Sequence, residues 1–215
     1  MLQAVSSMVA SAYLLFIGRL ALRQAKIASW PIAFIPILLA LQQAFESVMW
    51  IPKHVLIGSI AMTHFVLLTF FLWPIWIPFS LFCIEARRAR RLLIVCIWIA
   101  LLGAAWLLYK SVFLTYDVYR PLVQGRWDWG IQLYMASIII PFTLSSNPGI
   151  VVLGLMFVVS GIISCLGWQL AFLSMSNDFL EVLSFVWRLL AMGISSALVV
   201  YLSYWRDNKY GRPKI

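Results

Sequence analysis

The stretch SWPIAFIPILLALQQAFESVMW, residues 29–50, decides the fold class of this chain. It is almost entirely apolar over about 20 positions, which is the length an α-helix needs to cross roughly 30 Å of hydrocarbon. Near its end the run contains four polar residues, Gln42, Gln43, Glu46 and Ser47. We therefore predict a transmembrane helix that carries polar side chains in one of its halves.

The composition of the whole chain also indicates a membrane protein. Of its 215 residues, 64% are hydrophobic and 11% are charged, whereas an average soluble domain is roughly 25% charged. The 16 Lys and Arg outnumber the 7 Asp and Glu. In so apolar a chain, an excess of basic residues indicates which loops stay in the cytoplasm and which segments contact anionic lipid headgroups. We expect membrane lipids as partners, other membrane subunits as a further class, and no nucleic acid, because the aromatic residues do not alternate with basic ones.

Six further apolar stretches accompany the first. The predicted helices cover residues 4–22, 29–51, 55–84, 92–108, 130–144, 149–174 and 179–204. They predict an all-α fold, a polytopic membrane bundle of seven transmembrane helices that forms a single domain of residues 1–215. The third helix is too long for one straight crossing, and Pro74 and Pro78 should bend it. The fifth is short and contains Pro141; if it were re-entrant, the C-terminus would change sides.

The basic residues predict the orientation of the bundle, because positively charged loops stay in the cytoplasm. Eleven of them follow the first, third and seventh helices and fall on one side: Arg19, Arg23, Lys26, Arg87, Arg88, Arg90, Arg91, Arg206, Lys209, Arg212 and Lys214. The other side carries Lys53, Lys110, Arg120 and Arg126. We therefore expect the N-terminus outside, the C-terminus in the cytoplasm, and a location in the cytoplasmic (inner) membrane.

Polar residues inside the predicted helices are few, and each needs a partner or a role because it costs free energy in hydrocarbon. At about 1.5 Å per residue, five of them lie at depths in the outer half of the bundle where they could meet: Gln42, Glu46, His64, Gln169 and Arg188. We expect a ligand site in which Arg188 anchors an anion, Glu46 is its counter-ion or a proton carrier, and His64 titrates. The alternative is a buried Glu46–Arg188 ion pair that only fixes helix register. No equivalent set is evident in the cytoplasmic half.

The sequence shows no recognisable catalytic set. Zinc hydrolases use three protein ligands, but the chain has two histidines and no HExxH motif, so we expect no metal site. There is no GxSxG motif, although Ser47 or Ser7 near His64 is a conceivable nucleophile. Three hypotheses remain: a protein that binds a small or lipidic ligand or a partner subunit, a membrane-embedded hydrolase or lipid-modifying enzyme, and a structural accessory subunit of a larger membrane complex. We favour the first, and no cofactor is identified.

Four segments carry a pattern beyond apolar composition. Residues 29–50 are a proline-bearing apolar run that ends in Gln-Gln, then Glu, then Trp. The others are Trp73-Pro-Ile-Trp-Ile-Pro78, Glu85 with the basic run to Arg91, and Trp187. Together they resemble the DUF6629 family of uncharacterised bacterial multi-helix membrane proteins. The resemblance implies a bacterial origin and a membrane location, but it implies no activity.

Overall fold

A computed structural model of the chain describes residues 2–51, 55–85, 87–113, 129–159 and 177–210. The regular structure of these residues is entirely helical, so the predicted all-α class is confirmed. The elements are α1 (Leu2–Gln24), η1 (Ile27–Ser29), α2 (Trp30–Ala33), α3 (Ile35–Met49), α4 (Val55–Val66), η2 (Leu67–Leu72), α5 (Trp73–Ile84), α6 (Arg87–Phe113), α8 (Trp129–Thr143), the helix Pro148–Val159 and α10 (Asn177–Tyr210).

Most of each predicted segment is helical where the structure describes it; the exceptions are Phe34, between α2 and α3, and the segment ends Trp50, Ile51 and Leu144. Helix α6 is longer than the predicted helix 92–108 and extends beyond it at both ends. The sixth predicted helix is described only as far as Val159, and its remainder lies outside the described residues. Four helices are long and apolar enough to cross a membrane: Gln3–Gln24, Ile27–Met49, Ile60–Ile84 and Ala89–Tyr109. Three further apolar helices are shorter: Gln132–Thr143, Pro148–Val159 and Arg188–Tyr204.

Prolines shape two of the long helices. Pro36 stands in the first turn of α3, and the helix is interrupted at Phe34, between α2 and α3. The reason is that a proline has no N–H to continue the hydrogen-bond ladder of the helix. In the third predicted helix, the bend begins before Pro74. Residues Leu67–Leu72 form a π-helix, and the N–H of Trp73 donates to the carbonyl of Leu68, five residues earlier. This wider turn accommodates the proline ring that follows it.

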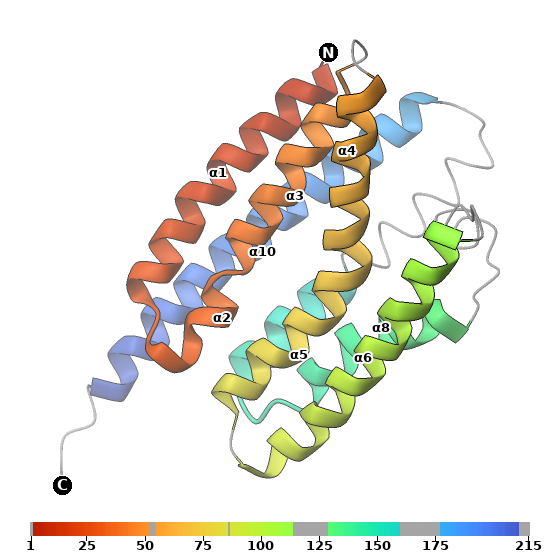
Figure 1. The fold of residues 1–215 in the computed structure, drawn as a ribbon. Helices are drawn as coiled ribbons and strands as arrows, with labels where there is room; N and C mark the ends of the chain where they lie inside the picture. Colours follow the sequence, from red (N-terminus) through yellow and green to blue (C-terminus); the bar gives the residue numbers. More distant parts are fainter. Residues whose placement is uncertain (1, 52–54, 86, 114–128, 160–176, 211–215) are drawn as a thin grey trace, which may run out of the picture.

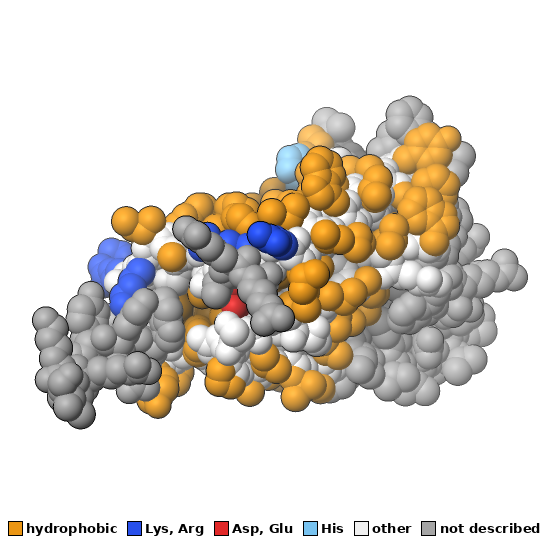
Figure 2. Space-filling view, turned by 90° about the horizontal axis from the view of Figure 1, so that it is seen from below, with side chains coloured by type: hydrophobic (Ala, Val, Ile, Leu, Met, Phe, Trp, Pro, Cys, Tyr) orange, Lys and Arg blue, Asp and Glu red, His pale blue; other side chains and the backbone are white. Residues whose placement is uncertain are grey.

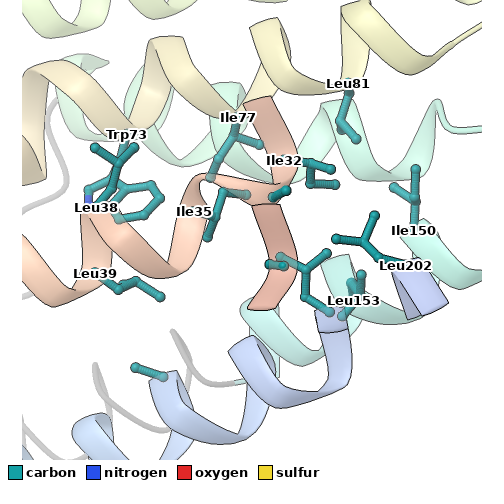
Figure 3. Packing of buried hydrophobic residues seen from close by; sticks show 14 of the residues in the cluster. Ile32, Ile35, Leu38, Leu39, Trp73, Ile77, Leu81, Ile150, Leu153 and Leu202 are labelled. Atoms are coloured by element: carbon teal, nitrogen blue, oxygen red, sulfur yellow. The ribbon is translucent and has the colours of Figure 1, made fainter. Parts of the chain in front are cut away.

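The bundle has two sides that meet at a shared core (Figure 1). On one side α1 packs against α3 and α10, and on the other α6 packs against α5 and α8. Between the two sides, Ile32 of α2 and Ile35 of α3 belong to one buried cluster with Ile77 of α5 and Leu153 of the helix Pro148–Val159 (Figure 3). That helix sits close to α8, because a Cβ atom at Gly154 would lie 2.3 Å from the Cβ atom of Phe142.

Candidate functional site

A buried arginine lies near the end of the bundle that holds the N-terminus, where α1 and α10 begin and α3 ends (Figure 1). The Nη2 atom of Arg188 is 3.0 Å from the Oε1 atom of Glu46, and the two side chains are 2% and 13% exposed. Arg188 also donates from Nη2 to Oε1 of Gln3 at 2.7 Å and from Nη1 to the hydroxyl of Ser6. We call Gln3, Ser6, Glu46 and Arg188 the N-terminal polar cluster.

This cluster connects three helices, α1, α3 and α10. A buried guanidinium is tolerated only where a counter-charge and further acceptors replace its water shell. Glu46 supplies the counter-charge, while Gln3 and Ser6 supply neutral acceptors. The predicted approach of Glu46 to Arg188 is thus present. The sequence analysis did not select Gln3 and Ser6. A signal was present, because polar residues recur every three to four positions along this helix, at Gln3, Ser6, Ser7 and Ser11.

Gln42 and His64 make their contacts elsewhere. The Oε1 atom of Gln42 accepts the indole N–H of Trp73 at 2.9 Å, and its Nε2 donates to Thr69 at 3.1 Å, so Gln42 ties α3 to η2 and α5. His64 is exposed and stacks on Phe45, with ring centroids 4.9 Å apart. The structure therefore brings Glu46 and Arg188 together and directs Gln42 and His64 to other partners. Gln169, the fifth predicted site residue, lies outside the described residues.

Among the described residues, neither of the serines considered as nucleophiles makes a hydrogen bond with His64. The hydroxyl of Ser47 donates to the carbonyl of Ala44 at 2.7 Å, and the Nδ1 atom of His64 lies 2.8 Å from the carbonyl oxygen of Ile60. The hydroxyl of Ser7 is buried and makes no hydrogen bond within the described part of the chain. The hydrolase and accessory-subunit hypotheses stay predictions.

A second buried polar cluster lies where α5 ends and α8 is followed by the helix Pro148–Val159. Glu85, which is 3% exposed, accepts hydrogen bonds from the hydroxyl of Ser145 and from the hydroxyl and N–H of Ser146, the last two at 2.6 and 3.3 Å. Beside them, Nδ2 of Asn147 donates to the hydroxyl of Tyr201 at 2.7 Å. We call these five residues the Glu85 cluster. Basic side chains gather on the surface of this end of the bundle (Figure 2).

The expectation that the half with the basic residues holds no polar set is therefore wrong. Glu85 lies just after the predicted helix 55–84 and directly precedes the basic run, and residues 145–147 lie between two predicted helices, so none of them was among the predicted site residues. One local signal was present: Asn147 stands before a proline and a new helix, and its Oδ1 accepts the N–H of Gly149 at 3.0 Å, as helix-capping asparagines do. Nothing in the spacing indicated that Glu85 would meet this turn.

Comparison with known protein families identifies a match over most of the chain. Residues 2–199 match the DUF6629 family, which is described as a family of unknown function. No curated protein and no solved structure matches the chain. This match confirms the family resemblance that the sequence showed. Because the function of the family is unknown, the activity has to be inferred from the geometry of the site.

Proposed function

We propose that this chain, which belongs to the DUF6629 family, is a bacterial membrane protein that binds a ligand through the N-terminal polar cluster. The ligand is a small or lipidic molecule with a carboxylate or phosphate group, and that group binds Arg188. The observation that carries the proposal is a guanidinium buried to 2% exposure whose counter-ion, Glu46, is the more exposed partner at 13%. The carboxylate is therefore the part of the ion pair that an incoming anion meets first.

The chemistry of the cluster suits an anionic group. A guanidinium offers five N–H donors in a planar fork that matches carboxylate and phosphate oxygens. A ligand oxygen that replaced the carboxylate of Glu46 would leave Arg188 paired, with Gln3 and Ser6 still bonded to it. The cost of burying the arginine is thus already met in the unliganded fold, and the ligand needs only to compete with Glu46.

We further propose that the protein crosses the cytoplasmic membrane seven times, with the N-terminus outside. Support comes from the four long apolar helices and the three shorter ones, and from apolar side chains that α6 exposes on its surface, Leu92, Val95, Trp98 and Leu102. Such side chains suit contact with lipid. The basic residues after the first, third and seventh helices support the orientation, because positively charged loops stay in the cytoplasm.

Reporter fusions test this topology. Green fluorescent protein fused after Ile215 should fluoresce, because it folds in the cytoplasm, and alkaline phosphatase fused at the same position should be inactive. Phosphatase inserted after Lys53, in the loop expected outside, should be active. An active phosphatase at Ile215 would exclude the proposed orientation and indicate an even number of crossings if the N-terminus is outside.

Binding of anions tests the proposed function. The purified protein in neutral detergent is titrated with phosphatidylglycerol and, separately, with inorganic phosphate, and bound species are counted by native mass spectrometry. We expect Glu46→Gln to bind at least one of these anions about tenfold more tightly, because the carboxylate no longer competes for Arg188. A tenfold change corresponds to about 1.4 kcal/mol of binding free energy. Phosphatidylcholine, which has no net charge, should bind both proteins equally.

A paired substitution supplies the matched control. The double variant Glu46→Gln with Arg188→Gln removes both charges and keeps hydrogen-bonding side chains, so it should fold but lose the anion-specific binding. Arg91→Gln, which removes an exposed arginine of α6, should leave that binding unchanged. The proposal fails if Glu46→Gln does not tighten binding of either anion or if the double variant binds them as well as the wild type.

A further inference from the structure

His64 places a polar side chain on the outer surface of a helix that we expect to cross the membrane. It lies in α4, within the apolar helical segment Ile60–Ile84, which is long enough to span a bilayer. Its side chain is nevertheless exposed. Ionisable residues inside membrane segments are costly in lipid, and they almost always face the bundle interior or a water-filled cavity. The exposure of His64 indicates that something other than lipid covers it.

Two contacts fix the imidazole ring of His64. Its Nδ1 atom lies 2.8 Å from the carbonyl oxygen of Ile60, one turn earlier, and the ring stacks on Phe45 of α3 with the centroids 4.9 Å apart. Because a carbonyl oxygen can only accept, Nδ1 carries the proton and donates it. In the neutral ring the other nitrogen, Nε2, is then an acceptor. Nε2 is directed away from the carbonyl of Ile60, and no residue in the described part of the chain bonds to it.

An exposed hydroxyl on the same bundle does not have this unmet acceptor. Thr143 of α8 is also exposed, but its hydroxyl donates to the carbonyl of Ile140 on its own helix at 2.8 Å. A hydroxyl can thus be satisfied by its own helix and needs no partner in lipid. The imidazole of His64 has a second nitrogen that its own helix leaves unbonded, and hydrocarbon chains contain no donor for it.

Large apolar side chains share the surface around His64. On α4 and η2, Ile60, Leu67 and Phe71 are 38–50% exposed, and together with His64 they recur at intervals of four, three and four residues. This spacing places them in one stripe, as on helices that pack against a partner helix. With two neighbouring side chains of α3 they form what we call the His64 face: Leu41, Phe45, Ile60, His64, Leu67 and Phe71.

We propose that a transmembrane helix of another membrane protein packs on the His64 face and donates a hydrogen bond to Nε2 of His64. The donor is the hydroxyl or side-chain amide of a Ser, Thr, Asn or Gln, because these groups bond across helices within membranes. The partner segment is a helix, because a backbone in lipid must satisfy its own polar groups. A second copy of this chain, related by a two-fold axis through this face, fits less well, since two facing His64 rings would each present an acceptor.

The inference rests on the membrane crossing proposed for the helix Ile60–Ile84 and is independent of anion binding at Arg188. Reporter fusions test the crossing, and anion titration tests the binding. A failure of either is therefore distinguishable from a failure at the His64 face.

Photocrosslinking in cells that naturally contain the protein tests the partner. The photoreactive amino acid p-benzoylphenylalanine is placed at Leu67, one turn from His64, and, as a control, at Trp98 of α6, which is 64% exposed. We expect the probe at Leu67 to crosslink to a membrane protein, within an apolar segment that carries a Ser, Thr, Asn or Gln. The probe at Trp98 should not give this crosslink.

Two variants of His64 separate the hydrogen bond from simple proximity. His64→Phe keeps a ring that can stack on Phe45 and removes Nε2, so the yield of the crosslink from Leu67 should fall about three- to tenfold, as expected for the loss of one hydrogen bond between membrane helices. His64→Gln keeps an acceptor and should retain most of the yield. Replacing the donor residue of the partner by Val should lower the yield as His64→Phe does, and the two changes together should lower it no further.

The melting temperatures of both His64 variants, purified in detergent, should be no lower than that of the wild type, because the side chain is exposed when the partner is absent. The proposal is overturned if the probe at Leu67 crosslinks only to lipid, to a second copy of this chain, to another segment of the same chain or to a segment without a donor. It is also overturned if Trp98 gives the same crosslink or if His64→Phe leaves the yield unchanged.

Discussion

Glu46→Leu should destabilise the protein more than any other substitution considered for the N-terminal polar cluster. It removes the counter-charge of Arg188, which is 2% exposed, and leaves the neutral acceptors Gln3 and Ser6 beside the guanidinium. Removing one partner of a buried ion pair costs about 3–5 kcal/mol, because the other charge stays buried. For a chain of this size, that corresponds to a fall of about 10 °C in melting temperature.

The measurement is the apparent melting temperature of the purified protein in detergent, followed by tryptophan fluorescence. Glu46→Leu combined with Arg188→Leu is the matched control, since it removes both charges and leaves apolar side chains. A buried pair replaced by apolar residues is often close to neutral, so the double variant should recover most of the loss. If the double variant is as unstable as Glu46→Leu, the charge of Arg188 is not the cause.

Glu85→Ala should be the second most damaging substitution. The carboxylate of Glu85 accepts hydrogen bonds from both hydroxyls and one N–H of Ser145 and Ser146. The hydroxyls can turn to other acceptors, but the N–H of Ser146 is fixed by the backbone and loses its partner. Hydrogen bonds to a charged group contribute about 1.5–3 kcal/mol each, so we expect a loss of about 3 kcal/mol and a fall in melting temperature of roughly 6–12 °C.

The loss should be local as well as global, because Glu85 holds the turn between α8 and the helix Pro148–Val159. Limited proteolysis of Glu85→Ala should cut near residues 145–147 faster than in the wild type. Glu85→Gln keeps one acceptor oxygen and should show a smaller fall in melting temperature. Unchanged cleavage and melting in Glu85→Ala would show that the turn is held by other contacts, such as the one between Asn147 and Tyr201.

The amino-acid sequence by itself determined the helices. An apolar run such as residues 29–50 has one stable way to satisfy its backbone away from water, which is to form a helix. The sequence also indicated the pairing of Glu46 with Arg188, because the chain has few charges inside its apolar segments and a buried charge must find an opposite one. Both conclusions depend on composition and on spacing along the chain, which local sequence carries.

Only the tertiary structure decided which helix faces turn toward each other. Gln42 and Glu46 are one turn apart on α3, yet Gln42 bonds Trp73 of α5 and Glu46 bonds Arg188 of α10. Glu85 meets Ser145 and Ser146 from a segment about 60 residues away. The physical reason is that helix rotation and neighbour choice are set by the packing of the whole bundle, and no spacing within a single helix records it.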